Sequence, residues 1–242
     1  IQDGKAAYKR DSARRENRNP EAYRDANSVR AYVKFARELG TQTLTITPYL
    51  RSNSMVFLQH YLPWQSRESN EHDSIGVQAS LSSVTDWGSY ITGIDIDVTE
   101  GELTEDQADA FSPNQPAGIH YDYRVDATNA ALFGQVEVAL SETVSLQAGL
   151  RSETSDYDYK TRAPAGSVCA AEASNCRFYR PENRSDDFSN LSGNLSLIWA
   201  QGDHRYYVRT ALGFRAPQAT ELDRLQAGQA VADIDSEEAT IT

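Results

Sequence analysis

The sequence lacks any uninterrupted apolar run that could form a membrane-spanning helix, although it has 242 residues in which to place one. Such a helix needs about 20 consecutive, predominantly apolar residues, and the mean hydropathy of this chain is only −0.60. The lack of such a run does not exclude a membrane β-barrel, because barrel strands show only alternating hydrophobicity over about ten residues. The composition therefore leaves a soluble protein and a membrane barrel to be distinguished.

Positive charge is too scarce for a nucleic-acid-binding protein. The chain has 23 lysines and arginines against 35 aspartates and glutamates, which gives a net charge of −12. Phosphate binding requires clustered Lys and Arg, so no nucleic-acid partner is expected. None of the four histidines has the spacing of an HExxH zinc site, and no Gly-x-Ser-x-Gly turn offers a nucleophile. We therefore expect no catalytic residues, no metal site and no cofactor.

Cysteine is almost absent. The only two, Cys169 and Cys176, lie close together in the segment GSVCAAEASNCRFYR, whose flanking residues are small, polar and typical of turns. No further Cys or His is near enough in sequence to complete a metal site. In an oxidising compartment, this spacing favours a disulfide bond within one loop. Two free thiols are the alternative.

Segments rich in β-forming residues come in pairs, each joined by a short link. In one pair, NAALFGQVEVAL is followed by Ser141-Glu142 and then by TVSLQAGLRSE. Links of about two to five residues of this composition are typical of β-hairpins. A further strand begins near Glu237. The eight paired strands are predicted at residues 30–37, 41–51, 74–83, 89–98, 129–140, 143–153, 188–200 and 204–214.

The connections between the hairpins are much longer than the links within them. They cover residues 54–73, 100–128, 155–187 and 216–236. Long structureless loops are uncommon in compact domains and usually carry function. The strict alternation of short and long connections is typical of an outer-membrane barrel, which has short periplasmic turns and long extracellular loops.

Within the predicted strands, apolar residues alternate with polar ones. In one strand Val144, Leu146 and Leu150 share a face, and Gln147 and Arg151 share the other. Successive side chains point to opposite faces, so a lipid-facing band around a wet interior would give this pattern, as would a soluble sheet with one solvated face. Charged residues avoid the apolar faces, and Trp and Tyr lie at strand ends, as interfacial girdles do. We therefore favour the barrel over a soluble β-sandwich.

Acidic residues on the polar faces could in principle act as general acids and bases. We expect them instead to line a hydrated interior and to pair with arginines. The acidic residues are Asp95, Asp97, Glu137 and Glu153, and the expected partners are Arg151, Arg209 and Arg215.

Two aromatic-rich stretches in the predicted external loops, FLQHYLPW and GIHYDYRVD, are candidates for substrate contact. Tyrosine offers apolar area and a hydroxyl at a modest entropy cost. Packing at a strand mouth is the alternative. In the LTEDQADAF segment, Thr104 is expected to cap a helical turn. The candidate substrate-facing residues are His60, Tyr61, Trp64, His120, Tyr121 and Tyr123.

Several segments together resemble the barrel portion of TonB-dependent outer-membrane receptors. FGQVEVALSETVSLQAGLRSE resembles a Gln/Glu strand, a short turn and an Ala-Gly-Leu-Arg strand, and GFRAPQATELDRLQ is similar to a Gly-Phe-Arg-Ala-Pro strand end. DIDSEEATIT is similar to the segment that opens the next strand. Pro217 lacks the N–H that a sheet ladder needs, so pairing should stop there. A helical turn is expected in residues 220–225.

The resemblance implies an all-β chain, namely a segment of an antiparallel transmembrane β-barrel with about nine strands of a larger barrel of about 22. Residues 1–242 would be part of the barrel domain, with the plug domain and the remaining strands outside this sequence. Residues 1–27 would form a loop or strand end, with a short helix near Pro20 as the alternative.

The resemblance also implies a function, which is active import across the outer membrane of a Gram-negative bacterium. External loops would bind a scarce substrate, most simply a ferric siderophore. TonB, acting through the plug and the TonB box, would supply the energy. The implied partners are outer-membrane lipid, TonB and a small-molecule metal chelate. A passive porin-like barrel and a secreted glycan-binding β-sandwich are the alternatives.

Overall fold

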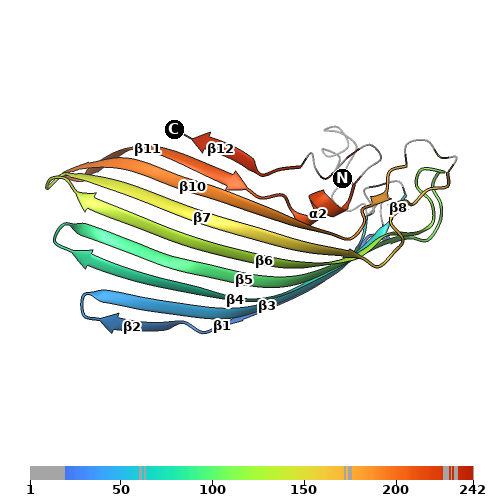
Figure 1. Cartoon of the computed structure of the whole chain (residues 1–242), viewed down its shortest axis with the longest axis horizontal. Helices are drawn as coiled ribbons and strands as arrows, with labels where there is room; N and C mark the ends of the chain where they lie inside the picture. Colours follow the sequence, from blue (N-terminus) through green and yellow to red (C-terminus); the bar gives the residue numbers. More distant parts are fainter. Residues whose placement is uncertain are drawn as a thin grey trace, which may run out of the picture.

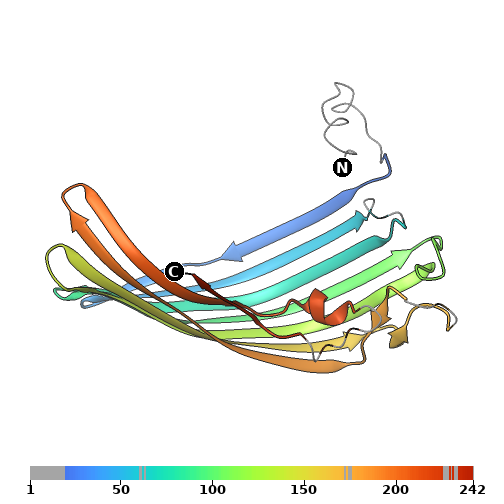
Figure 2. The same ribbon diagram turned by 90° about the horizontal axis from the view of Figure 1, so that it is seen from above.

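A single antiparallel sheet of ten strands makes up most of the molecule, and it is bent into an open trough (Figures 1 and 2). The computed structural model describes residues 20–59, 62, 64–171, 173, 176–225, 229, 231 and 234–241. In these residues the two edges of the sheet do not pair with each other, and no helix is long and apolar enough to cross a membrane. The predicted all-β antiparallel fold is confirmed, and the continuous sheet is not a sandwich.

The strands follow one another across the sheet in the order β1-β3-β4-β5-β6-β7-β10-β11-β12, and β2 also pairs with β3. Outside this sheet lie the two-stranded ribbon β8 (Gly166–Ser167) and β9 (Tyr179–Arg180) and the helix α2 (Ala219–Asp223). The ten strands of the sheet are β1 (Arg24–Tyr32), β2 (Phe35–Leu39), β3 (Gln42–Leu58), β4 (Arg67–Thr85), β5 (Gly88–Gln107), β6 (Gly118–Ala139), β7 (Val144–Thr161), β10 (Arg184–Gln201), β11 (His204–Arg215) and β12 (Glu237–Ile241).

All four predicted hairpins are present, and their short turns lie together at the left end of Figure 1. Gly40 and Gly202 adopt φ values of +67° and +57° in two of these turns. This left-handed backbone conformation is one that glycine adopts at little cost. The longer connections, with α2 and β8, lie at the opposite end (Figure 1).

Most strands are longer than predicted, so three of the four connections between hairpins are shorter than predicted and the fourth is unchanged. They cover residues 59–66, 108–117, 162–183 and 216–236. The helical turn expected after Thr104 is wrong, because Thr104 lies in β5 and pairs with Asp122 of β6. The helix expected after Pro217 is present as α2, and β11 ends at Arg215, one residue beyond the predicted strand and before Pro217 as expected.

The first predicted strand is divided into β1 and β2. Tyr32 pairs with Tyr49 and Phe35 pairs with Ile46, so the interruption lies opposite Pro48 of β3. Proline has no N–H to donate to a neighbouring strand, which accounts for the break. Strand β1 begins at Arg24, and residues 1–19 lie outside the described residues.

One face of the sheet carries an exposed apolar belt in the half nearer the short turns. On β10 the belt runs from Leu191 to Trp199, and a transmembrane strand has about 9–11 residues. Trp199 packs on Tyr206 beside a short turn, with ring centroids 5.3 Å apart. Exposed members of the belt are Leu50, Ile75, Ile94, Ile96, Val98, Leu132, Leu150, Leu191, Leu195, Leu197, Val208 and Leu212.

Beyond the belt, the same outward face becomes charged. Asp73, Glu100, Asp126 and Asp158 pair in register to form one row across β4, β5, β6 and β7. Like charges directly opposite one another destabilise a sheet. Arg124 offsets this repulsion with an ion pair to Glu100 at 2.6 Å. The outer face therefore has a lipid-compatible half and a water-compatible half.

Candidate functional site

Inward-facing ion pairs cross from strand to strand along the concave wall. Arg151 on β7 lies 2.6 Å from Asp95 on β5 and 2.7 Å from Glu153. Arg51 on β3 lies 2.7 Å from Asp97 on β5. Each link between strands passes over one intervening strand, because concave curvature brings inward side chains together. Arg151 pairs with Asp95 and Glu153 as predicted, whereas Asp97 pairs with Arg51.

The other predicted inward residues have different partners. Glu137 accepts a hydrogen bond from the Ser145 hydroxyl at 3.0 Å. Arg215 lies 2.9 Å from Glu221 and 3.1 Å from Glu237. Arg215 therefore joins the end of β11 to α2 and to the start of β12.

Gly76 on β4 permits one of the links across the wall. Tyr49 on β3 passes over Gly76 and donates a hydrogen bond to Asp97 on β5. A Cβ atom at Gly76 would lie 2.3 Å from Tyr49 Cζ, which is too close for non-bonded carbon atoms. Glycine is therefore required by this close approach.

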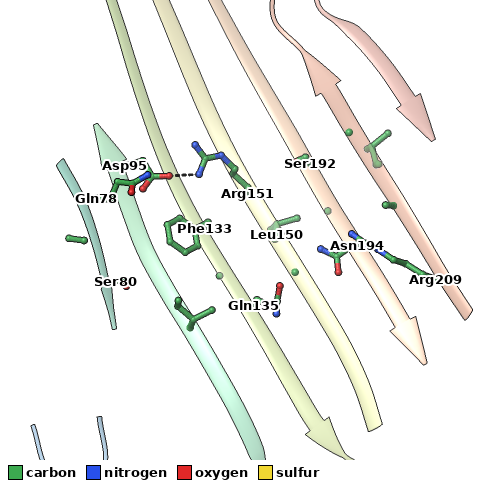
Figure 3. A pocket seen from close by; sticks show the side chains of 18 of the residues that line it. Gln78, Ser80, Asp95, Phe133, Gln135, Leu150, Arg151, Ser192, Asn194 and Arg209 are labelled. Carbon is green, nitrogen blue, oxygen red and sulfur yellow. Dashed lines mark hydrogen bonds and ion pairs between the residues drawn. The ribbon is translucent and has the colours of Figure 1, made fainter. Parts of the chain in front are cut away.

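A broad hollow of about 780 Å³ lies on the concave face and extends from β3 to β12. Figure 3 shows its lining, with the ion pair between Asp95 and Arg151 at one side and Arg209 at the other. Most of the other labelled side chains are uncharged and polar, including Gln78, Gln135 and Asn194. Such a surface suits water or another polar body rather than lipid.

At the end of the sheet away from the short turns, two connections pack onto the wall. One is residues 162–183, and the other is residues 216–225, called the strap below. The backbone N–H of Tyr179 donates to the carbonyl of Leu225 at 3.1 Å and joins the two. The buried apolar cluster at this end contains Leu103, Tyr121, Tyr123, Val125, Tyr159, Cys169, Cys176 and Phe178.

His120 is aimed into this region by an irregularity in β6. The register shifts between Glu105 and Asp106, so His120 has no partner residue across the ladder. Such a bulge redirects a side chain. The side chain of His120 is 0% exposed, its Nδ1 lies 3.2 Å from Glu105 Oε1, and its ring stacks on Phe178 with centroids 3.8 Å apart.

Arg224 of the strap lies between two carboxylates of the wall. It donates to Glu68 Oε2 at 2.9 Å and also to Glu105, and it lies 5.2 Å from the Tyr121 ring centroid. The side chains of Glu68 and Glu105 are 10% and 1% exposed. Burial raises the pKa of Glu105, but the hydrogen bond with His120 and the charge of Arg224 outweigh it and bring the pKa below its ordinary value.

The strap also buries an acid and covers a cavity. Asp223 is 2% exposed, and burial raises its pKa to about 8 despite the opposing positive charge of Arg184. The cavity has a volume of about 330 Å³ and lies between Ala219 and Thr220 of α2 and the wall. Wall residues that line the cavity include Arg51, Asn70, His72, Val125, Asn129 and Tyr157.

The sequence matches a known family over nearly its whole length. The family model described as TonB dependent receptor-like, beta-barrel, matches residues 3–240. The chain belongs to this family. As a TonB-dependent receptor barrel it is located in the outer membrane of a Gram-negative bacterium, and the family consists of transporters rather than enzymes. The short turns are periplasmic, and the strap and the other long connections are extracellular.

Solved structures of TonB-dependent receptors share the fold. The copper transporter OprC superposes with a TM-score of 0.63 at 15% identity, covering 90% of this chain and 35% of OprC. The siderophore receptor PiuA from Acinetobacter baumannii gives 0.61 at 11% identity, covering 90% of this chain and 37% of PiuA.

The ferric-catecholate import receptor Fiu from E. coli K12 gives a TM-score of 0.58 at 10% identity, covering 79% of this chain and 36% of Fiu. The chain therefore spans about a third of the length of these structures. No curated protein sequence matches it.

The structure brings only some of the candidate substrate-facing residues of this receptor barrel together. His120, Tyr121 and Tyr123 come together beneath the two packed connections, where they are 0–3% exposed. Trp64 has other neighbours, because its ring lies 6.2 Å from that of Phe111 and 4.8 Å from the Arg177 guanidinium. Contact of these side chains with substrate stays a prediction. His60 and Tyr61 lie outside the described residues.

The two cysteines of the receptor barrel, Cys169 and Cys176, form a disulfide bond. It closes part of the connection that holds Phe178, whose ring stacks on His120. The disulfide therefore limits the conformations of the segment that covers the candidate residues. Redox conditions at the cell surface permit such bonds.

The sequence does not predict the buried ionisable residues at and beneath the strap. Glu68 and Glu105 fall in segments predicted as loops, and Arg224 and Asp223 follow a strand end. Asp223 is a helical acid with no sequence feature that indicates burial. Leu103 and Glu105 are two residues apart, so they share one face of β5, and both are buried, but this segment is predicted as the start of a helix.

Proposed function

We propose that the full-length receptor imports a scarce substrate across the outer membrane, with energy supplied by TonB. The observation that carries this proposal is the division of the wall into an exposed apolar belt outside and a row of ion pairs inside. An apolar outer face requires lipid, and a charged concave face requires a polar occupant. Family membership supports TonB as the energy source.

A plug domain is the occupant that fits the concave wall. The hollow of about 780 Å³ presents amides, hydroxyls and arginines, which suit hydrogen bonding to a folded polar domain. We place this plug, with its TonB box, in the part of the receptor that precedes the barrel. Residues 1–242 then contribute wall strands and extracellular connections.

The substrate that we propose is a ferric siderophore. Two of the solved structures with this fold are described as a siderophore receptor and a ferric-catecholate import receptor, while a third is described as a copper transporter. Transition-metal uptake, as the ion or as a chelate, is the chemistry that these descriptions suggest.

Uptake by whole cells tests the proposal. A strain lacking the gene is complemented with the full-length receptor, and accumulation of radioactive iron is followed with catecholate, hydroxamate and citrate chelates. We expect uptake of at least one chelate, with loss of that uptake in a tonB deletion strain or after addition of a proton uncoupler. Uptake that persists without TonB and without the proton gradient would make the protein a passive porin.

A further inference from the structure

We propose that the strap is an autoinhibitory lid. In the substrate-free receptor, Arg224 clamps it to Glu68 and Glu105 over the concave wall, and substrate reaches the wall beneath only after the clamp opens. This inference rests on the proposed transport function, because it concerns access to the same side of the barrel. The lid is part of the extracellular connection between β11 and β12.

The clamp is a pair of hydrogen bonds from one arginine to two residues that are distant in the sequence. Arg224 is separated by 156 residues from Glu68 and by 119 residues from Glu105, and it donates to one from Nη1 and to the other from Nη2. A guanidinium fork is suited to this because its geometry is planar and fixed. Two nearly buried carboxylates would lose the charge of Arg224 if the fork withdrew, and poorly compensated buried charges are costly. The closed state is therefore specifically favoured.

The rest of the strap depends on this docking. The helix α2 has only five residues, and a helix of that length is not stable alone in water. Its other anchors are the buried side chains of Leu222, Asp223 and Leu225, the hydrogen bonds from Tyr121 and Tyr179 to the Leu225 carbonyl, and the exposed ion pair of Arg215 with Glu221. A short segment with few anchors opens as one unit, so loss of the clamp should release all of it.

The closed lid leaves too little room for a large chelate. The cavity beneath it has a volume of about 330 Å³, at the lower end of the range of about 300–1,000 Å³ for ligand pockets. Val125 lines this cavity and is 5% exposed. A metal chelate much larger than the cavity could contact Val125 and its neighbours only if the strap moved away.

Cysteine accessibility tests the clamp without any substrate. Val125→Cys is introduced beneath the strap and Ser185→Cys on the outward face of β10, each in the full-length receptor in intact cells. A membrane-impermeant maleimide should label Val125→Cys at least tenfold faster when Arg224→Ala is added. Labelling of Ser185→Cys should not change. As a matched arginine control, Arg67→Ala, which removes an exposed ion pair at 3.9 Å, should leave the labelling of Val125→Cys slow.

A reversible lock tests whether opening is needed for transport. Tyr179 and Leu225 form an antiparallel bridge, and such partners have Cα atoms about 4.5–5.5 Å apart, within the range of about 4.4–6.8 Å for disulfides. The double variant Tyr179→Cys/Leu225→Cys, with its cross-link verified by mass spectrometry, should lose at least nine-tenths of ferric siderophore uptake. Mild reductant should restore it, while uptake by the unmodified receptor should be insensitive to the same reductant.

The outcomes separate the two proposals. If the locked receptor imports as fast as the unmodified one, or if Arg224→Ala leaves both the labelling of Val125→Cys and the uptake rate unchanged, the lid is refuted. If the unmodified receptor imports no chelate, the transport proposal fails, and the labelling result still decides whether Arg224 closes the strap.

Discussion

The two halves of the sheet differ on their outer faces, although the same strands run through both. Near the periplasmic turns, outward side chains such as Leu195 and Leu132 are apolar and exposed. Beyond Leu191 on β10 and Val98 on β5, the outward positions are occupied by Ser189 and Glu100. The backbone ladder continues unchanged across this boundary. Pairing of strands therefore does not depend on which solvent the outer face meets.

The two halves are stabilised in different ways. In the belt half, lipid covers the outer face and ion pairs such as Arg151 with Asp95 link strands on the inner face. In the outer half, the inner face has a buried cluster that includes Tyr159 and Phe178, as a water-soluble domain would. The difference indicates that the extracellular end is a small packed unit built on top of a membrane wall.

The largest expected effect comes from a charge on the outer face of the belt. Leu195→Arg should destabilise the inserted receptor by about 2–4 kcal/mol, the cost of Arg near the bilayer midplane. The amount of folded, heat-modifiable receptor in outer membranes measures this loss. Ser189→Arg, on the same strand and face but beyond the belt, should retain nearly normal levels. Equal losses at the two positions would contradict the boundary.

A smaller effect is expected from filling the space above Gly76. Gly76→Ala places a Cβ atom against Tyr49 and should cost about 1–3 kcal/mol, the usual range for overpacking. Gly101→Ala, on β5 in the outer half, places its Cβ atom 3.4 Å from His72 and should cost much less. Guanidinium unfolding of the receptor in lipid vesicles compares the two. A larger cost for Gly101→Ala would show that the inward links of the belt half are not tightly packed.

A third prediction concerns pH, to which only the outer half should respond near neutrality. The pKa of Asp223 is raised to about 8 when the strap is docked, whereas a free Asp titrates near about 3.9. Docking is therefore most favourable in acid, and it weakens as pH rises toward 8, where the docked carboxyl also ionises. The labelling of Val125→Cys, normalised to Ser185→Cys, should increase between about pH 6 and pH 8.

The groups around Asp223 determine the control for this experiment. Arg184 and Asp186 of β10 face it with opposite charges, and burial keeps Tyr123 neutral throughout the range. The pKa of Glu105 is lowered, so its contribution to docking is lost only at pH values below its ordinary pKa. Asp223→Asn should therefore abolish the pH dependence. A pH response that survives this substitution would assign it to another group.

The smallest effect is expected from the exposed ion pairs above the belt. Lys160 lies 2.8 Å from Asp158 and 3.4 Å from Asp126, and all three side chains are substantially exposed. Pairs of this kind add little to stability. Lys160→Ala should leave the midpoint of thermal unfolding unchanged within error. A clear decrease would show that the charged row is a structural element in its own right.

The boundary between the halves also explains how far the sequence could predict the fold. The strands predicted to end at Arg51, Val98 and Glu153 in fact continue to Leu58, Gln107 and Thr161. The predicted ends lie close to the edge of the apolar belt. Beyond that edge the outward positions become polar or charged, and apolar residues such as Leu103 and Tyr159 face inward instead. The pattern of apolar outward and polar inward positions that indicated a strand therefore ends while the ladder continues. The hairpin turns were predictable because their chemistry is local.

The packed unit at the extracellular end of the wall could not be predicted in the same way. Arg224 meets Glu68 and Glu105 only because the strap folds back over the wall, and no local pattern encodes a contact over more than a hundred residues. The aromatic residues His120, Tyr121 and Tyr123 were recognised as a group from their spacing. Their burial depends on two other connections, so the sequence alone left both packing and substrate contact open.

The change of solvent along one strand tests the central claim most directly. Spin labels are placed one at a time on the outward face of β10, at positions 185, 187, 189, 191, 195 and 197, in the receptor reconstituted in lipid. We predict that labels at 191, 195 and 197 are relaxed by oxygen, which concentrates in the bilayer, and that labels at 185, 187 and 189 are relaxed by a water-soluble nickel complex. Uniform relaxation by the nickel complex along the whole strand would contradict the division of this wall into a membrane half and an extracellular half.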